Sequence, residues 1–465
     1  MPRSGSSSDV TAAVLRAASD RATAYLRTLD ARRVAPDPAA VDRLTEYADG
    51  PMPAGPAPPD AVLRALDELG SPATVANAGP RYFGFVTGGA LPVTIAANWL
   101  ATAWDQNAFA HVASPAAVVL ENTALRWLLD LLGLPPDAGA AFVTGATMAN
   151  FTALAAARHR VLADAGWDAE AKGLFGAPAI TVVVGAEAHS TLYKALGLLG
   201  LGRERVVTVP ADGQGRMRAD ALPAMSGPTI VCLQAGNVNT GAFDPAGEVC
   251  ARARAAGAWV HVDGAFGLWA AAAPALADLA AGVADADSWA TDAHKWLNVP
   301  YDSGIALVRD AAALSAAMSV AAPYLPDADR RDPFAFTPES SRRARGVEIW
   351  AVLSALGRSG LAALIEGNCA LARRFADKLA AGGCEVLNEV VLNQVLVAFG
   401  DDETTARVIA AVQADGTCWC GGTTWHGRHA MRISVSSWAT TEADVDLSVE
   451  AILRLARAEG MGQGN

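Results

Sequence analysis

The stretch AWVHVDGAFG, residues 258–267, joins a short apolar run to a carboxylate and a glycine. Four to eight apolar residues bounded by turn residues are typical of a buried β-strand. Asp263 stands at the end of this run, and ligands of open α/β sheets bind at the carboxyl ends of the strands. Asp263 is therefore a candidate binding residue. The same position would also suit an aspartate that caps a following helix.

Similar apolar runs recur between about residue 81 and residue 310, separated by longer Ala- and Leu-rich stretches. The runs are AFVTG (141–145), AITVVVG (179–185), TIVCLQAG (229–236) and SGIALVR (303–309). Buried strands that alternate with helices predict a mostly parallel sheet covered by helices on both faces. The expected fold class is therefore α/β.

Segments of a different character flank this part of the chain. Residues 9–30 carry apolar side chains at helical spacing, and residues 51–60 form a Pro-rich linker. Helices without a core of their own must pack on something else, and a partner subunit is one candidate. After Arg345 the chain is first helical and then alternates strand-like and helical segments. The predicted units are an N-terminal helical segment (1–80), a large domain (81–345) and a small α+β C-terminal domain (346–465).

Composition narrows the classes of function. The chain has 465 residues, of which 52% are hydrophobic and 18% charged, enough for large cores in two or three domains. A net charge of −12 argues against nucleic acid and anionic membranes as partners. The N-terminus has no secretion-signal pattern, and reduced cysteines fit a cytoplasmic protein. No metal site is expected, although the C-x-C of Cys418 and Cys420 could bind a soft metal.

TGATMANF, residues 144–151, follows one predicted strand and opens a helix. Small residues around Gly145, Ala146 and Thr147 would let backbone N–H groups bind an anion at the helix N-terminus. The Gly-Lys-Ser/Thr ending of a nucleotide-binding loop is missing, so a single phosphate monoester fits better. An ordinary strand-to-helix turn would have the same sequence character.

Two further motifs carry a histidine and a lysine. AEAHSTLYKA (186–195) places His189 after a strand, where its ring could stack on a flat ligand, although a lone histidine is more often structural. In TDAHKWLNVPYDSG (291–304), Lys295 lies between His294 and Trp296. A lysine buried among aromatic groups has a depressed pKa and can form an imine, whereas an isolated lysine is usually a surface residue.

Together the four motifs fit one cofactor, pyridoxal 5′-phosphate. This cofactor needs a lysine for its imine, an anion site for its phosphate and a carboxylate against its pyridine nitrogen. Lys295, the turn at 144–151 and Asp263 could supply these three groups. The carboxylate would keep the pyridine nitrogen protonated, so that the ring can accept electrons from the bond being broken.

The same motifs resemble those of the group II pyridoxal-phosphate-dependent amino-acid decarboxylases, which include the aromatic-L-amino-acid and glutamate decarboxylases. The resemblance runs from about Pro80 to the C-terminus, and DAHKW following HVDGA is its most specific part. Other matching motifs are PRYFGF (80–85), ASPAAVVLE (113–121), GAFDP (241–245), RRARGVEIW (342–350) and MRISVS (431–436). The resemblance implies fold type I of the pyridoxal-phosphate-dependent transferases, with a mostly parallel seven-stranded sheet. It also implies a homodimer with shared active sites and an amino-acid substrate.

The resemblance assigns roles to individual residues. Lys295 would form the imine, Asp263 would pair with the pyridine nitrogen, and His189 would stack on the ring; Lys295 and His189 would be catalytic. Further cofactor-binding positions are Ala146, Thr147, His294, Asp292 and Asn237, the last a loose match to a family threonine. Arg432 corresponds to an arginine that holds the substrate carboxylate. The substrate pocket would be lined by Phe85, Thr87 and Phe334 and, from the partner subunit, by Asn107 and Phe109.

The implied reaction is decarboxylation of an L-amino acid to CO2 and an amine, by way of an external aldimine and a quinonoid. A loop tyrosine donates the α-proton in the best-known relatives, and the corresponding place here holds Asp332-Pro333-Phe334. In some relatives a phenylalanine there accompanies oxidative deamination to an aldehyde. Aldehyde synthase, aldolase and aminotransferase therefore remain alternatives, with Tyr324, His189 or a water as other proton donors. A non-catalytic dimeric binding protein is a further alternative, and the polar Asn107 leaves room for a non-aromatic substrate.

Overall fold

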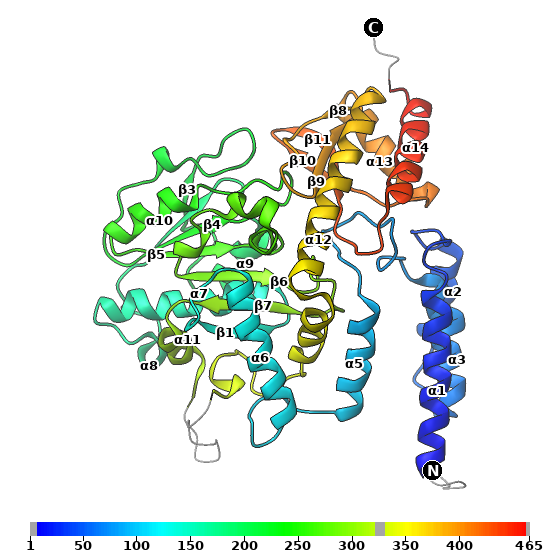
Figure 1. Ribbon diagram of the computed structural model, residues 1–465, viewed down its shortest axis with the longest axis horizontal. Coiled ribbons are helices and arrows are strands. Elements are labelled where there is room, and N and C mark those ends of the chain that lie inside the picture. Colours follow the sequence, from blue (N-terminus) through cyan, green and yellow to red (C-terminus); the bar gives the residue numbers. More distant parts are fainter. Residues whose placement is uncertain (1–6, 321–330, 462–465) are drawn as a thin grey trace.

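The computed structural model describes residues 7–320 and 331–461. Its large domain is built on a seven-stranded sheet in the order β1-β7-β6-β5-β4-β2-β3 (Figure 1). Neighbouring strands are parallel except for β7, which is antiparallel to both β1 and β6. The expected α/β class with a mostly parallel seven-stranded sheet is confirmed. The strands are β1 (Gly139–Val143), β2 (Thr181–Gly185), β3 (Val207–Val209), β4 (Thr229–Gln234), β5 (Trp259–Asp263), β6 (Ser288–Asp292) and β7 (Gly304–Val308).

Five of these strands coincide with the apolar runs recognised in the sequence. The other two have no such run. Strand β6 reads SWATD and is wholly buried, so its polar residues are accommodated by hydrogen bonds inside the sheet rather than by apolar packing. Strand β3 has only three residues and lies at the exposed edge of the sheet. Hydrophobic pattern alone therefore overlooks both.

Helices cover both faces of this sheet. On one face Val182, Val184 and Ile230 pack against α7, α9 and α11. On the other face the side chains of Val183, Val231 and Val260 join a core that α6, α10 and α12 complete. The alternation of Val182, Val183 and Val184 between the two cores is the period-two pattern of a doubly covered strand. The helices are α5 (Pro92–Trp104), α6 (Pro115–Leu131), α7 (Ala146–Asp164), α8 (Ala169–Lys172), α9 (Ser190–Leu198), α10 (Ala246–Ala255) and α11 (Ala311–Met318), with short 3-10 turns η2 (Ala219–Ala221), η3 (Gly267–Ala272), η4 (Pro274–Ala280), η5 (Val283–Asp285) and η6 (Pro333–Ala335).

The long helix α12 (Gly346–Ala381) joins the large domain to the small one (Figure 1). Its first half packs Ile349 and Val352 into the large core, and its second half packs Phe375 and Leu379 into the small core. Gly357 interrupts the helix with a positive φ of 58°. By length and composition α12 could cross a membrane, but it supplies buried residues to both cores, as a core helix of a globular protein does. The two domains therefore share this helix rather than meeting at one residue.

The small domain is a four-stranded antiparallel sheet in the order β10-β11-β9-β8, covered by helices. Helix α14 begins with a capping box in which Thr441 and Asp444 satisfy each other's backbone N–H groups. Phe83 also packs into this core, although it lies within the range 81–345 predicted for the large domain. The chain around Phe83 therefore belongs to the small domain by packing. The elements are β8 (Glu385–Val386), β9 (Gln394–Ala398), β10 (Gly421–Trp425), β11 (Arg428–Ser434), α13 (Asp402–Asp415) and α14 (Glu442–Ala458).

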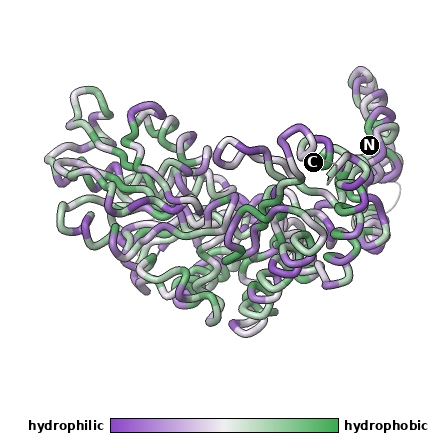
Figure 2. The backbone as a smooth tube through the Cα atoms, turned by 90° about the horizontal axis from the view of Figure 1, so that it is seen from above, coloured by the Kyte–Doolittle hydropathy of each residue, from purple (hydrophilic) through white to green (hydrophobic). Residues whose placement is uncertain are grey.

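The N-terminal helices project from one end of the molecule (Figure 2). Arg21 of the first helix forms a 2.9 Å ion pair with Asp67, which holds the segment together. The segment is tied to the small domain through Arg81, which bonds Asp30 O and Asp444. The first helix ends four residues earlier than the 9–30 pattern predicts, where the Thr28 hydroxyl donates to Tyr25 O. The elements are α1 (Ser7–Leu26), α2 (Pro38–Ala48), α3 (Pro59–Ala65), the π-helical turn η1 (Leu66–Gly70) and α4 (Ser71–Ala73).

Removing the capping hydroxyl of α14 should destabilise the small domain. Thr441→Ala leaves the Asp444 N–H without its side-chain acceptor, which costs about 1 kcal/mol at a helix N-cap. Urea unfolding followed by circular dichroism would show a lower midpoint, while Thr441→Ser, which keeps the hydroxyl, should unfold like the unchanged protein. Equal midpoints for the alanine and serine variants would contradict this role of the cap.

Candidate cofactor site

The predicted site residues meet at one edge of the large sheet. Asp263 is the last residue of β5 and Asp292 the last residue of β6, and these two strands are parallel neighbours. Helix α7 starts directly after β1 at Ala146, and His189 is the N-cap of α9 after β2. These strands all point the same way, so their carboxyl ends bring the side chains together.

Lys295 follows β6 and is held by an ion pair. Its Nζ lies 2.8 Å from Asp292 Oδ2, and its side chain is 19% exposed. The chain before α5 passes directly over the lysine backbone, because a Cβ at Gly88 would lie 1.6 Å from Lys295 O. Next to it, Trp296 is fully buried and its Nε1 donates to Asn368 Oδ1 at 3.0 Å. The lysine therefore has a fixed backbone and an amine that still reaches solvent.

The N-terminus of α7 presents the expected anion-binding turn. Gly145 and Gly304 are in close contact, since a Cβ on Gly304 would lie 2.4 Å from Gly145 Cα. The N–H of Ala146 donates to Asp292 Oδ1 at 2.5 Å. A carboxylate can only accept hydrogen bonds, so Asp292 cannot itself donate one to a phosphate. The N–H groups of the α7 N-terminus remain the donors that fit a phosphate, and the role of Asp292 is to hold this turn and Lys295.

The two site histidines are neutral and fixed by hydrogen bonds. His294 stacks on Tyr301 with ring centroids 4.3 Å apart, and its Nδ1 accepts the Ser303 N–H. His189 Nδ1 accepts the Thr191 N–H and lies 2.7 Å from the Thr191 hydroxyl. Burial lowers the pKa of both imidazoles. Each ring is therefore held in one orientation, and His294 Nε2 lies 3.5 Å from Asp292 Oδ1.

His189 also shows that the predicted residues share one electrostatic environment. After burial, four neighbouring charges act on the pKa of its imidazole: those of Asp263, Lys295, Arg432 and Asp292. Two of these groups raise the pKa and two lower it, which is the pattern of a ring surrounded by both carboxylates and cations. These charges belong to the residues that the resemblance assigns to the imine, the pyridine nitrogen and the substrate carboxylate, and the assignments stay predictions.

Asp263 is buried, with 5% of its surface exposed. Its Oδ1 accepts the Ala265 N–H at 3.2 Å and its Oδ2 accepts from Asn150 Nδ2 at 3.0 Å. Asn150 in turn contacts His261 at 2.8 Å. Asn150 and His261 were overlooked in the sequence, although His261 stands two residues before Asp263 on one strand and so shares its face.

Arg432 lies on β11 of the small domain and is half-buried. Burial lowers the pKa of Arg432, and no hydrogen bond or ion pair to it is found within residues 7–320 and 331–461. A buried guanidinium without an anion is costly, and a carboxylate is its preferred partner. This position suits the carboxylate of a small substrate.

Asn237 has a different setting from the one expected. Its Oδ1 accepts the N–H groups of Asn239 and Thr240, and its Nδ2 donates to Glu187 O at 3.4 Å. These contacts close the turn after β4, so the amide stabilises the loop. The turn accounts for the polarity of this residue, and its part in cofactor binding stays a prediction.

Phe85 and Thr87 lie on the segment that crosses Lys295. Phe85 has a positive φ of 53° and is 64% exposed, with its ring 5.5 Å from Trp419. Thr87 is buried, and its hydroxyl lies 3.5 Å from that of Tyr301. An exposed aromatic side chain held in this backbone conformation is available to a ligand or to a second chain.

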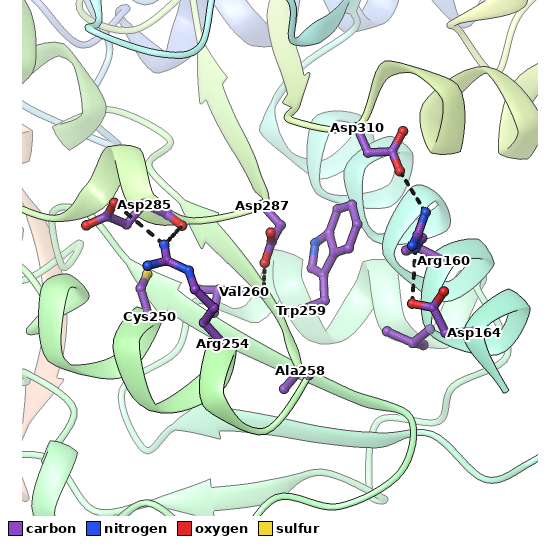
Figure 3. A pocket seen from close by; sticks show the side chains of 12 residues that line it. Arg160, Asp164, Cys250, Arg254, Ala258, Trp259, Val260, Asp285, Asp287 and Asp310 are labelled. Carbon is purple, nitrogen blue, oxygen red and sulfur yellow. Dashed lines mark hydrogen bonds and ion pairs between the residues drawn. The ribbon is translucent and has the colours of Figure 1, made fainter.

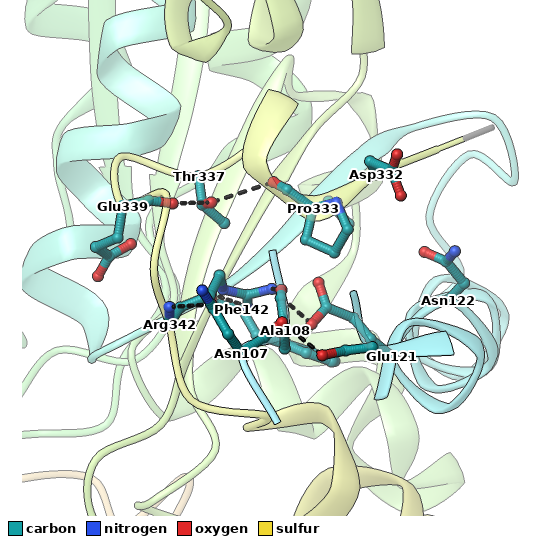
Figure 4. A network of polar contacts seen from close by, with 12 residues as sticks. Asn107, Ala108, Glu121, Asn122, Phe142, Asp332, Pro333, Thr337, Glu339 and Arg342 are labelled. Atoms are coloured by element: carbon teal, nitrogen blue, oxygen red, sulfur yellow. Dashed lines mark hydrogen bonds and ion pairs between the residues drawn. The ribbon is translucent and has the colours of Figure 1, made fainter. Parts of the chain in front are cut away.

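Asn107, Phe109 and Phe334 form a separate group, in which the rings of Phe109 and Phe334 lie 6.2 Å apart between centroids. Figure 4 shows Asn107 beside Arg342 and Glu121. Asn107 Oδ1 accepts the Arg342 N–H at 3.0 Å, and Phe109 O accepts the Phe334 N–H at 3.0 Å. A buried ion pair of 2.7 Å between Arg342 and Glu121 fixes this arrangement. Within the described ranges, no hydrogen bond, ion pair or ring contact joins these three residues to Lys295, Asp263 or His189. Tyr324 and the rest of 321–330 lie outside the described residues.

A hollow at the opposite edge of the sheet carries charged groups that are already paired (Figure 3). Arg160 pairs with Asp164 and Asp310, and Arg254 pairs with Asp285. Ala258, just before β5, lines this hollow, so it lies at the amino end of the strand that Asp263 terminates. Both arginines of the hollow are paired and the hollow lies at the amino ends of the strands, so it is not the candidate site.

The residues at the carboxyl edge fit pyridoxal 5′-phosphate. Lys295 offers an amine with solvent access, the start of α7 offers N–H groups to a phosphate, and Asp263 offers a buried carboxylate to the ring nitrogen. No cluster of metal-binding side chains is found among the residues described.

Comparison with known proteins agrees with this assignment. The rice (Oryza sativa subsp. japonica) tryptophan decarboxylase 1 is 28% identical over 439 residues, 85% of this chain and 84% of that protein. L-2,4-diaminobutyrate decarboxylase of Rhizobium meliloti is 33% identical over 58% of this chain and 53% of its own length. Aromatic-L-amino-acid decarboxylase of Bacillus atrophaeus is 28% identical over 63% of this chain and 62% of its own. The chain thus spans between half and five-sixths of these relatives.

Solved structures share the whole fold. The Oryza sativa TDC crystal structure with PLP and tryptamine has a TM-score of 0.89 at 25% identity, covering 98% of this chain and 99% of that one. The mouse CSAD structure has a TM-score of 0.89 at 22% identity, covering 97% and 99%, which shows the fold alone. The family model of the pyridoxal-dependent decarboxylase conserved domain matches residues 49–400. Because this family model covers more than half of the sequence, the chain belongs to the pyridoxal-dependent decarboxylases.

Proposed function

We propose that this protein removes the carboxyl group of an L-amino acid as CO2 and releases the amine, with pyridoxal 5′-phosphate as its cofactor. One observation carries the proposal: Asp263 ends β5 beside the end of β6, whose last residue, Asp292, lies 2.8 Å from Lys295 Nζ. An amine, a carboxylate and a carboxylate-binding cation around one flat ring are the groups that this chemistry needs.

The work of the protein in this reaction is orientation and proton transfer. The bound cofactor supplies the electron sink for the bond that breaks. Arg432 holds the substrate carboxylate, and His189 limits the ring on one face. Asp263 would hold the proton of the ring nitrogen, and Lys295 Nζ would be the amine that binds the cofactor. As CO2 leaves, a proton must reach the α-carbon, so that one carboxyl group is replaced by one hydrogen.

The side chain of the substrate is selected by residues other than those that contact the cofactor and the substrate carboxylate. Relatives named for tryptophan, for acidic amino acids and for L-2,4-diaminobutyrate differ in that side chain alone. Here Phe85 is exposed beside the site, and Asn107 with Phe109 lies in the group that is not joined to Lys295 of the same chain. These residues would line the part of the pocket that contacts the side chain.

A homodimer with shared sites is part of the proposal. Helices α5 and α6 and the loop between them expose large apolar side chains, which on a monomer would face water. They are Trp99, Leu100, Trp104, Val112, Val119 and Trp127, and the N-terminal segment adds Leu15, Val62 and Leu66. A second copy covering them could also receive Phe109 and Phe334. We place the protein in the cytoplasm, because its six cysteines are buried and free, as reducing compartments favour.

A second candidate outcome rests on Phe334. A phenylalanine cannot donate a proton, and it stands where relatives carry the proton-donating loop tyrosine. Loss of CO2 coupled to oxidative deamination would then give an aldehyde, ammonia and hydrogen peroxide, with molecular oxygen as the oxidant. A panel of L-amino acids assayed for CO2, amine, aldehyde and peroxide decides between the outcomes. Amine in the same amount as CO2 supports decarboxylation, and peroxide in that amount overturns it.

Lys295→Ala should abolish turnover and the visible absorption band of the lysine-bound cofactor. The amine is the group that forms the imine, so no other lysine should be labelled after borohydride reduction of the unchanged protein. Peptide mapping of the reduced protein is the measurement. Labelling of Lys194 or Lys172 instead would contradict the assignment.

Asp292→Asn should strengthen cofactor binding by about tenfold, which is about 1.4 kcal/mol. Asp292 accepts from the Ala146 N–H, so its negative charge lies beside the turn that would hold the phosphate. Asparagine keeps an acceptor oxygen and removes the charge. Titration of the cofactor-free protein by absorbance gives the dissociation constant, and exposed Asp285→Asn at the far edge is the control. Weaker binding would show that the carboxylate assists the cofactor instead.

Shared sites predict complementation between two inactive variants. Lys295→Ala and Phe109→Ala, each with low activity alone, should form mixed dimers in which one site has both unchanged residues. Random reassociation of equal amounts should restore about a quarter of the activity of the unchanged protein. The reason is that half of the dimers are mixed and each mixed dimer has one intact site of two. No recovery in verified mixed dimers would contradict sites built from two chains.

A further inference from the structure

A line of buried polar side chains runs from Asp263 into the protein. Asn150 Nδ2 lies 3.0 Å from Asp263 Oδ2, and Asn150 Oδ1 lies 2.8 Å from His261 Nε2. His261 Nδ1 lies 2.9 Å from Ser288 Oγ, which is also 2.9 Å from Trp259 Nε1. Asn150, His261 and Ser288 have no exposed surface. The line joins helix α7 to strands β5 and β6.

The direction of every hydrogen bond in this line follows from its two ends. Trp259 Nε1 can only donate, and an ionised Asp263 can only accept. Asn150 must then donate its amide N–H to Asp263 and accept from His261 Nε2–H. His261 Nδ1 is left to accept the Ser288 hydroxyl, whose oxygen accepts from Trp259. All four bonds therefore point their hydrogens towards Asp263.

His261 has to be neutral for this order to hold, and its surroundings keep it so. The imidazole is completely buried, and burial lowers the pKa of His261 to about 3. Its two ring nitrogens contact an amide oxygen and a hydroxyl, and neither carries a charge. The ring is therefore held as a single tautomer at neutral pH.

Aligned hydrogen bonds in a buried setting polarise one another and strengthen the last bond of the chain. That last bond is made to a carboxylate, and a hydrogen bond to the charged form favours ionisation. The second oxygen of Asp263 accepts the Ala265 N–H, so the carboxylate cannot turn. Apolar side chains at these positions would fill the same space without supplying such a field.

We propose that Asn150, His261 and Ser288 are positioning residues that hold the Asp263 carboxylate in the orientation in which it contacts the pyridine nitrogen of the cofactor. The inference rests on the proposed function, because it assigns these residues to the proton on that nitrogen. They touch neither substrate nor cofactor and act through Asp263. Loss of the line lowers the basicity of the pyridine nitrogen and with it the electron-accepting strength of the ring.

The decisive measurement is nitrogen NMR of isotope-labelled cofactor bound to the enzyme, which reports directly whether the pyridine nitrogen is protonated. Asn150→Leu and His261→Phe interrupt the line with apolar side chains of similar size. Both should move the signal towards the unprotonated form at neutral pH. Ser288→Ala, which removes the group furthest from Asp263, should produce a smaller shift in the same direction.

The kinetic effect should fall on one parameter. Asn150→Leu should lower kcat about tenfold or more, the factor expected from losing a hydrogen bond to a charged group, with KM little changed. His261→Gln, which offers both a donor and an acceptor, should recover part of the NMR shift and of kcat. A purely structural role would lower stability without moving the signal of the bound cofactor.

Thr152→Val is the matched control. Thr152 is a buried residue of α7 two positions after Asn150, and its hydroxyl donates to Met148 O inside the helix. The variant should lose stability comparably and leave the pyridine signal unchanged. If Asn150→Leu fails to fold, Ser288→Ala and His261→Gln still decide the matter.

The outcomes separate the role of the line from the proposed function. An unchanged pyridine signal in folded Asn150→Leu, His261→Phe and Ser288→Ala enzymes that bind the cofactor would overturn the role of the line alone. Failure of the unchanged protein to bind pyridoxal 5′-phosphate would overturn the proposed function, and the role of the line with it.

Discussion

A carboxylate that is almost fully buried imposes the strongest demand on this structure. Removing the charge of Asp263 from water costs several kcal/mol unless hydrogen bonds replace the lost hydration. The compensation comes from different parts of the chain: the Ala265 N–H after β5, and Asn150 from α7. Helix α7 must therefore lie over the sheet at one position, and that position also places its N-terminus at the anion-binding turn. The charge of Asp263 and the placement of α7 are thus linked.

The sheet topology adds the remaining groups. Because β5 and β6 run in parallel, Asp263 and Asp292 end side by side, and the turn after β6 carries Lys295. The antiparallel β7 returns beside β6, and its first residue, Gly304, lies against Gly145 with no room for a side chain. Arg432 comes from the small domain, so the substrate end of the site depends on how α12 joins the two cores. Among the described residues, no hydrogen bond, ion pair or ring contact joins the group around Phe109 and Phe334 to Lys295, Asp263 or His189 of the same chain. In the proposed homodimer these side chains would line the site of the second copy.

Several site residues could be predicted because their positions relative to predicted strands carry information. Asp263, His189 and Lys295 each follow a strand, and carboxyl ends of parallel strands converge. Strand β6 escaped notice because SWATD has no apolar pattern. Its polar side chains are satisfied by partners on β5, in the loop after β5 and at the start of α7. Asn237 follows a strand, as a cofactor-binding residue would, but its amide oxygen accepts the N–H groups of Asn239 and Thr240 in its own turn. Asn150 and His261 escaped because a buried hydrogen-bond partner leaves no periodic signal in a sequence.

By itself, the sequence determined the α/β class and the order of the strand-end motifs, and it predicts Lys295 as the cofactor lysine. These follow from local rules: apolar periodicity, small residues at a helix start and the chemistry of single side chains. Only the tertiary structure decided that Asp292 binds both the Ala146 N–H and Lys295, that Arg432 lacks an anion among the described residues, and that four aligned hydrogen bonds end on Asp263. The contact of Asp292 with Ala146 and those of Asn150 with Asp263 and His261 join residues more than a hundred positions apart. Hydrogen bonds are short and directional, so such contacts exist only once packing has brought the segments together.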